Sequence, residues 1–127
     1  MIEYVLDASA ILAVVKRERG FQQVQLAADR SAMSTVNIAE VGSFMTKEGF
    51  KLDEVRTTLA AFPIEIIAFD KEQAMEAARL RPLTLRSGLS LGDRACLALA
   101  GLRGLTALTS ERVWADLDLG VKVELIR

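Results

Sequence analysis

The chain of 127 residues is long enough for one domain with one hydrophobic core, and its 51% hydrophobic and 26% charged residues exclude a disordered protein. It has no histidine and a single cysteine, which excludes internal disulfides, histidine-based catalytic triads and zinc sites of the histidine–cysteine type. If the protein is an enzyme, its chemistry must come from carboxylates, hydroxyls, lysine or arginine, and with a net charge of −1 any surface for nucleic acid must be local.

The first predicted element is a β-strand. Residues 2–6 form an apolar, β-favouring run that is typical of a central strand buried on both faces, and the run stops at Asp7. A wide apolar face then predicts a helix over residues 8–19. A second, shorter helix is expected over residues 21–30, with Leu26 among the residues that face the core.

The middle of the chain predicts two strands and two helices. Residues 31–34 are expected to form a short strand, and a helix follows it through about residue 47. Candidates for the N-terminal cap of this helix are Ser34, Thr35 and Asn37. Residues 52–62 form the cleanest amphipathic helix of the chain, and residues 64–68 predict the next strand.

The last part of the chain begins with a helix that Asp70 caps and Pro82 closes. Residues 81–92 hold glycines, serines and arginines, and we interpret them as a basic, bendable loop of the kind that carries function. The remaining elements are a helix over 93–103, a buried strand over 105–109, a short helix over 111–117 and an alternating strand over 121–126 that suits a sheet edge.

Strands that alternate with helices and leave no room for hairpins indicate a parallel sheet covered by helices on both faces. The expected fold class is α/β, a three-layer α/β/α arrangement with a central, mainly parallel sheet, formed by residues 1–127 as one domain. Cys96 is expected to be a buried structural thiol. The chain has no apolar run of roughly 20 residues and no signal region before the first strand, which predicts a cytoplasmic protein without membrane association.

Four acidic residues lie at or near the starts of helices. They are Asp7, Glu40, Asp93 and Glu111. Because the carboxyl ends of parallel strands meet at one edge of a sheet, we expect these side chains to converge. Taken singly, each acid is interpreted as a helix cap, since acids favour the helix N-terminus and two of them have the spacing of a capping pair.

Taken together, the four acids predict a metal site. Crowded carboxylates repel one another and raise each other's pKa unless a cation neutralises them. Mg²⁺ and Mn²⁺ prefer oxygen ligands and stabilise both oxygens of an in-line phosphoryl displacement. An acidic cluster without histidine therefore points to metal-assisted cleavage of phosphodiesters.

Four sequence segments carry a family resemblance. They are VLDASA at 5–10, NIAEV at 37–41, LSLGDRACLALA at 89–100 and LTSERVW at 108–114. Together they resemble the motifs of PIN-domain ribonucleases, most of all the VapC-type toxins of bacterial toxin–antitoxin pairs, and the third segment is the most specific. The resemblance covers essentially the whole chain. It implies a PIN-like fold and a Mg²⁺- or Mn²⁺-dependent endoribonuclease toxin.

The resemblance also implies roles for the acids. Asp7, Glu40 and Asp93 match the positions that hold a divalent metal in the family. Glu111 matches a fourth catalytic position that is usually aspartate, and Asp116 is the alternative for that position.

Further residues are expected to support the site. Ser9 and Thr109 match family positions that support the acids or their waters. Arg86 and Arg94 flank the third acid, and we interpret them as candidates for gripping an RNA phosphate. Trp114 is interpreted as a core or dimer residue.

Other protein classes fit the residues less well. A phosphoacceptor receiver domain also binds Mg²⁺ in an acid cluster, but Asp7 has no acidic neighbour and no lysine follows the strand over 105–109. A phosphatase of the haloacid dehalogenase type would need an acid where Ser9 stands. The non-enzymatic alternative is a binding or receiver-like regulatory domain whose acids only cap helices.

The partners implied by the resemblance are an RNA substrate, a small antitoxin protein whose tail covers the acids, and a second copy of the chain in a homodimer. The apolar residues of 52–62, with Phe44 and Met45, are expected to line one of the two protein interfaces.

Overall fold

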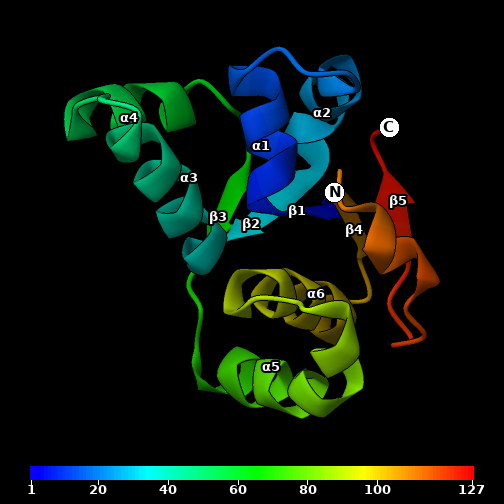
Figure 1. Ribbon diagram of the computed structural model, residues 1–127. Coiled ribbons are helices and arrows are strands. Elements are labelled where there is room, and N and C mark those ends of the chain that lie inside the picture. The colour runs from blue at the N-terminus through cyan, green and yellow to red at the C-terminus, as the bar shows by residue number, and fades with distance from the viewer.

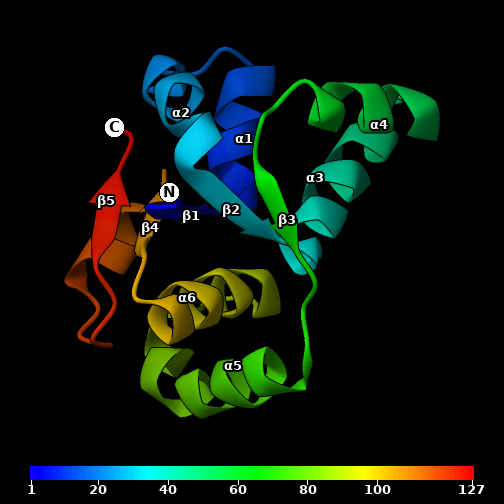
Figure 2. The same ribbon diagram turned by 180° about the vertical axis from the view of Figure 1, so that it is seen from behind.

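The computed structural model describes all 127 residues and shows a five-stranded parallel sheet between two layers of helices (Figures 1 and 2). The strands are β1 (Tyr4–Leu6), β2 (Ser31–Ser34), β3 (Glu65–Ile67), β4 (Thr106–Thr109) and β5 (Val123–Leu125). The helices are α1 (Ala8–Val15), α2 (Phe21–Ala27), α3 (Thr35–Lys47), α4 (Leu52–Ala60), α5 (Lys71–Thr84) and α6 (Leu91–Arg103), and three 3₁₀ turns are η1 (Ala28–Arg30), η2 (Leu85–Ser87) and η3 (Arg112–Asp116). The predicted α/β class with three layers is confirmed.

The sheet has the strand order β3-β2-β1-β4-β5, with every neighbouring pair parallel. Its side chains alternate between two cores because successive residues of a strand point to opposite faces. Leu6 and Leu108 pack with α1 to α4 on one face, while Val5 and Ala107 pack with α5 and α6 on the other. Burial on both faces explains why the central strands read as apolar runs.

Helix α1 is shorter than the sequence pattern predicts. It ends at Val15, Lys16 is its C-terminal cap, and Arg17 takes a left-handed backbone conformation with φ 54°. Gly20 follows with φ 93°, and a Cβ there would overlap the carbonyl of Ile126. The turn between α1 and α2 therefore lies directly against the C-terminal segment.

Helix α2 buries a narrower face than predicted. Leu26 was expected to face the core, but it is 76% exposed. Val24 and Ala27 are the buried residues of α2. Leu26 lies about 200° around the helix from Val24, so both cannot face the sheet.

Pro82 does not close α5, contrary to the prediction. The helix continues to Thr84, where the hydroxyl donates to the carbonyl of Leu80 at 2.9 Å. Both residues are fully buried, so packing against α6 carries the helix past the proline. The segment over 81–92 is accordingly less of a loop than predicted, since it contains the end of α5, all of η2 and the first turn of α6.

The C-terminal segment agrees with the sequence pattern except in one element. The expected helix over 111–117 is the 3₁₀ turn η3, while β5 lies at a sheet edge as predicted. Trp114 is 1% exposed and belongs to the core beside α5 and α6, and Cys96 is a buried thiol. None of the helices is long and apolar enough to cross a membrane.

Candidate functional site

The acids meet where the strand order reverses. From β1 the chain builds outward through β2 and β3 on one side and β4 and β5 on the other, so the strand order reverses between β1 and β4, the place where ligands of open α/β sheets bind. Asp7 directly follows β1, and Thr109 is the last residue of β4. Their side chains touch, because the Thr109 hydroxyl donates to Asp7 Oδ2 at 2.7 Å.

Asp7 is a buried carboxyl group with three hydrogen-bond donors around it. It is 3% exposed and caps α1, accepting from the backbone N–H of Ala10 at 3.1 Å. The hydroxyl of Ser9 lies 2.8 and 2.9 Å from its two oxygens. Burial raises the pKa of Asp7 to about 7, with a further rise from the charge of Asp93, and the hydrogen bonds only partly oppose this shift.

The two hydroxyls beside Asp7 are themselves held by the backbone. Ser9 Oγ accepts from the N–H of Ser110 at 3.1 Å, and Thr109 Oγ1 accepts from the N–H of Glu111 at 3.0 Å. Because each oxygen is occupied as an acceptor, its proton is directed to the carboxylate. Ser9 and Thr109 thus both hydrogen-bond to Asp7.

Glu40 lies on α3 and is held against the first turn of α6. The side-chain amide of Asn37 donates to Glu40 Oε1 at 2.8 Å and to the carbonyl of Gly92 at 3.0 Å. A Cβ on Gly92 would overlap the Glu40 carboxylate, so glycine is required for this approach. Burial raises the pKa of Glu40, the Asn37 bond opposes the rise, and the charge of Asp93 adds to it.

Asp93 occupies the third position of α6 and forms a capping box with Ser90. Its N–H donates to Ser90 Oγ at 3.1 Å, and its Oδ2 accepts from the N–H of Ser90 at 2.9 Å. The side chain remains half-buried, with its second oxygen, Oδ1, making no hydrogen bond in the structure. Asp93 therefore caps its helix and still faces the other two acids.

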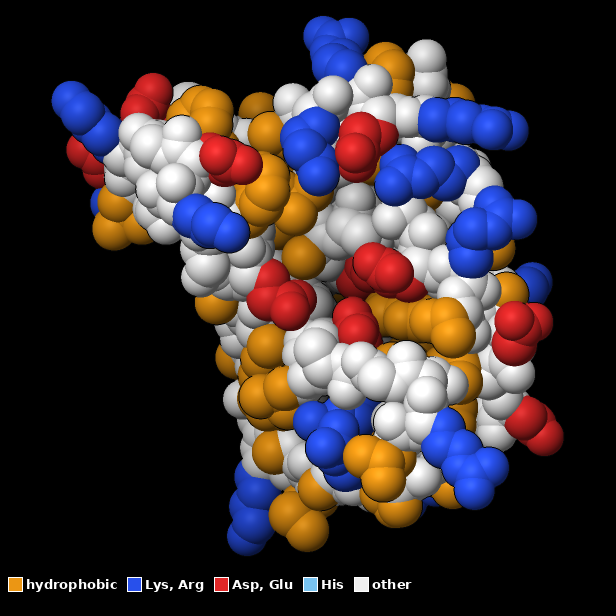
Figure 3. Space-filling view, in the orientation of Figure 1, with side chains coloured by type: hydrophobic (Ala, Val, Ile, Leu, Met, Phe, Trp, Pro, Cys, Tyr) orange, Lys and Arg blue, Asp and Glu red, His pale blue; other side chains and the backbone are white.

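The charges of the three acids all act on the buried thiol of Cys96. Cys96 is fully buried on α6 with its thiol 3.8 Å from the carbonyl of Val5. Burial raises the pKa of this thiol well above its usual value, and the charges of Asp7, Asp93 and Glu40 raise it further. In Figure 3, acidic side chains gather near the centre of the face, by the ends of α3 and α6, with basic side chains around them.

No group of three or more acidic or thiol side chains is already arranged as a complete metal site. The reason is visible in the hydrogen bonds, since Asp7, Glu40 and Asp93 each bind a neighbour on their own segment. Their donor set of hard carboxylate oxygens nevertheless suits Mg²⁺ or Mn²⁺, which bind through few carboxylates and keep several waters. The chemistry of this donor set therefore fits such an ion.

The two candidates for the fourth acid are both exposed. Glu111 lies at the start of η3, and only its backbone N–H is tied to the site, through Thr109. Asp116 is the last residue of η3 and makes no side-chain hydrogen bond. Glu111 is thus connected to the buried acids and Asp116 is not.

The two candidate arginines differ in the same way. Arg86 is exposed on η2 and makes no ion pair. Arg94 is half-buried on α6 and donates to the carbonyl of Ala77 at 2.9 Å, while its Nε is buried without a partner. Arg94 therefore joins α6 to α5, and Arg86 is the arginine left free for a phosphate.

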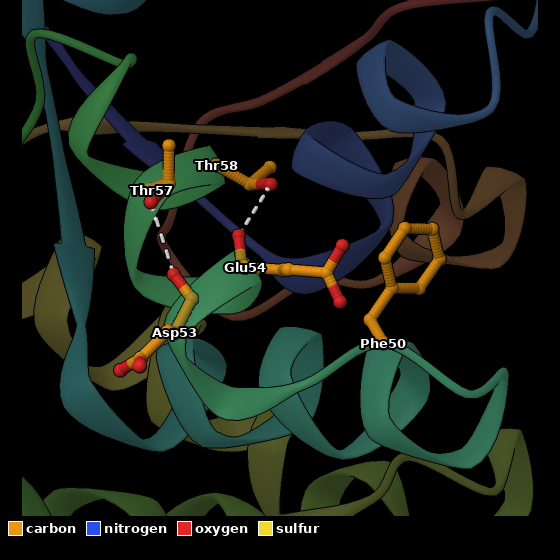
Figure 4. A pocket seen from close by; sticks show the side chains of 5 residues that line it. All are labelled: Phe50, Asp53, Glu54, Thr57 and Thr58. Atoms are coloured by element: carbon orange, nitrogen blue, oxygen red, sulfur yellow. Dashed lines mark hydrogen bonds between the residues drawn. The ribbon is translucent and has the colours of Figure 1, made fainter.

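The hollows of the surface lie away from the acids. One of about 360 Å³ is lined by Phe50, Asp53, Glu54, Thr57 and Thr58 of the α4 region (Figure 4). Its threonine hydroxyls donate to backbone carbonyls one turn earlier, at 3.0 and 2.8 Å, so they are not offered to a ligand. The acids themselves occupy an open face, which suits a polymer better than a small molecule.

Sequence reasoning missed two residues of the site. Asn37 was interpreted as a candidate cap that forms a capping pair with Glu40, but Ser34 caps α3 and Asn37 bridges two helices. Its spacing of one turn before Glu40 was the available signal. The requirement for Gly92 follows from a contact between α3 and α6, and no local pattern indicates it.

The model of one protein family, the PIN domain, matches residues 4–119. Solved structures similar to the chain include a DNA-bound VapBC complex from Salmonella typhimurium, with 18% identity, 100% coverage of both chains and a TM-score of 0.78. A toxin–antitoxin complex from Klebsiella pneumoniae has 21% identity, 98% coverage of both chains and a TM-score of 0.77. VapBC-5 from Mycobacterium tuberculosis has 28% identity, coverage of 100% of this chain and 99% of that chain, and a TM-score of 0.61. No curated protein sequence matches significantly.

Proposed function

This chain belongs to the PIN domain family, and from that premise we propose that it is a VapC-type toxin, an endoribonuclease that depends on Mg²⁺ or Mn²⁺. The observation that carries the proposal is that three acids come together from different elements: Asp7 lies at the end of β1, and Glu40 of α3 is held against Gly92, the residue before Asp93 in α6. Membership of a nuclease family and likeness to the toxin–antitoxin complexes support the toxin role. RNA as the substrate and the cytoplasm as the location are parts of the proposal.

In this proposal Asp7, Glu40 and Asp93 hold the divalent ion. When bound, such an ion lowers the pKa of water and stabilises negative charge on phosphoryl oxygens. Ser9 and Thr109 donate to Asp7 and keep its oxygens oriented, while Glu111 at the mouth of the site is the fourth acid. Water adds to phosphorus and gives up a proton, the bond from phosphorus to the leaving ribose oxygen breaks, that oxygen takes up a proton, and no covalent intermediate with the protein forms.

The rival function is a binding or regulatory domain whose acids only cap helices. Two of the acids fit this rival function, because Asp7 caps α1 and Asp93 forms a capping box with Ser90 at the start of α6. Glu40 favours the enzyme, because it caps no helix and is held instead toward α6. A cap also does not need to be buried as Asp7 is, since Asp70 caps α5 from an exposed position.

Incubation of the purified protein with a mixed cellular RNA tests the proposal. We expect endonucleolytic fragments with Mn²⁺ or Mg²⁺ and none with excess chelator. Intact RNA in the presence of both metals, or equal cleavage with chelator, would contradict it.

The proposed protein partners are a small antitoxin and a second copy of the chain. A groove of about 350 Å³ between α3 and α4 supports one of these contacts, since Ile38 and Leu59 line it and Leu52 is 55% exposed. Met45, which was expected at an interface, is 1% exposed and belongs to the core. Light scattering should give a dimer, or a larger complex with the antitoxin; a monomer at every concentration in both samples would count against these partners.

A further inference from the structure

We propose that Asn37 is a positioning residue that clamps Glu40 against α6 and thereby sets the spacing between the Glu40 and Asp93 carboxylates. Asn37 is fully buried, and its amide nitrogen carries two hydrogens. One is donated to Glu40 Oε1 and the other to the carbonyl of Gly92. The inference rests on the proposed function, because it gives the clamp a role in metal binding.

The orientation of the amide follows from its neighbours. Both atoms that face Nδ2 are acceptors, so only the NH₂ group can lie there. This orientation leaves Asn37 Oδ1 buried with no partner. A buried oxygen without a partner is unfavourable, which indicates that the bonds made by the amide nitrogen determine the arrangement.

The clamp joins two helices that carry different acids. Asn37 and Glu40 lie one turn apart on α3, while Gly92 immediately precedes Asp93 on α6. Holding Glu40 to the Gly92 backbone therefore fixes its carboxylate relative to Asp93. The clamp also depends on the absence of a side chain at Gly92, because a Cβ there would displace the Glu40 carboxylate.

The experiment measures Mn²⁺ affinity by calorimetry and the melting temperature in chelator for four variants. Asn37→Ala should weaken Mn²⁺ binding about 10- to 100-fold, as loss of a group that orients a ligand does, and should lower the melting temperature. Gly92→Ala should weaken Mn²⁺ binding similarly without lowering the melting temperature, because alanine favours helix and a flexible glutamate can move aside.

Two matched controls separate positioning from general stability. Gln73 is also a buried amide that donates to a backbone carbonyl, Ala68 at 2.9 Å, and keeps an unpaired oxygen. Gln73→Ala should lower the melting temperature and leave Mn²⁺ affinity unchanged. Gly42→Ala adds a Cβ in ordinary contact with Val55 at 3.6 Å and should also leave Mn²⁺ affinity unchanged.

Wild-type Mn²⁺ affinity in both Asn37→Ala and Gly92→Ala would overturn the inference. A double-mutant cycle of Asn37→Ala and Glu40→Ala in chelator tests the clamp without metal. If the double variant loses less melting temperature than the two single variants lose together, the clamp is upheld. If its loss equals the sum of the two single losses, the clamp is overturned. If the wild-type chain binds Mn²⁺ but cleaves no RNA, the proposed function fails while these affinities still decide the role of Asn37.

Discussion

Asp7 and Asp70 are two aspartates with the same local structure and different surroundings. Each precedes a helix in extended backbone conformation and accepts from the backbone N–H three residues later, at 3.1 Å from Ala10 and at 2.9 Å from Gln73. Asp70 is exposed after the edge strand β3, whereas Asp7 is buried at the point where the strand order reverses. The two aspartates therefore make the same helix cap, and their positions in the sheet distinguish the candidate site residue Asp7 from Asp70.

The largest expected effect comes from Asp7→Asn. It removes a charge and a metal ligand with almost no change of shape, so RNA cleavage should fall by more than about 100-fold, beyond the 10- to 100-fold of residues that only orient a ligand. The melting temperature in chelator should stay level or rise, because a buried charge is removed. Asp70→Asn is the matched control, which should retain full cleavage. An active Asp7→Asn enzyme would remove the distinction between the two caps.

Thr109→Val tests the surroundings of Asp7 without touching its charge. The change removes the 2.7 Å bond to Asp7 and the acceptor for the N–H of Glu111. We expect cleavage and Mn²⁺ affinity to fall about 10- to 100-fold. Thr57→Val removes a hydroxyl that bonds only its own helix and serves as the control; equal effects of the two changes would contradict a supporting role for Thr109.

The dependence on pH tests the burial of Asp7. The pKa of Asp7 is raised from 3.8 to about 7, so its contribution to stability is fully present below pH 3.8 and is lost as pH rises through 7. The metal-free protein should lose melting temperature over this window, and Asp7→Asn should lose less. Mn²⁺ affinity should change in the opposite direction, falling up to about 10-fold per pH unit below 7, because binding displaces the proton. Calorimetry at pH 5.5, 6.5 and 7.5 measures it, and a flat profile would contradict a buried ligand.

Glu111 should matter less than the buried acids, because it is exposed and only its backbone contacts the site. Glu111→Gln should lower cleavage by less than about 10-fold, below the range for residues that orient a ligand. Glu111→Asp should be tolerated. If Asp116→Asn lowers cleavage more than Glu111→Gln, the fourth acid is Asp116 and the rest of the site is unchanged.

The smallest expected effect is that of Arg86→Ala on RNA binding. One phosphate contact releases about one counterion, so the slope of log affinity against log salt should become shallower by about 0.7 for single-stranded RNA. Arg103→Ala, at the far end of α6, should leave the slope unchanged. An unchanged slope for Arg86→Ala as well would show that Arg86 contacts no phosphate.

The sequence was sufficient to predict most of the fold because the central strands are buried on both faces and their apolar runs are continuous. It was misleading at Pro82, because packing of α5 against α6 carries the helix past the proline. It was also misleading at Leu26, because this residue lies about 200° around α2 from the buried Val24. The convergence of Asp7, Glu40 and Asp93 followed from parallel strand order. The bridge from Asn37 to Gly92 joins residues 55 positions apart, so no spacing rule predicts it.

A titration of the wild-type protein with Mn²⁺, followed by its melting temperature, tests the central claim most directly. An ion that binds only the folded chain stabilises it by about 2.7 kcal/mol at 100 times its dissociation constant. We therefore predict a rise of several degrees that grows with the logarithm of the Mn²⁺ concentration, and that Asp70→Asn retains and Asp7→Asn loses. No rise in the wild type, or an equal rise in both variants, would contradict a metal site built on Asp7.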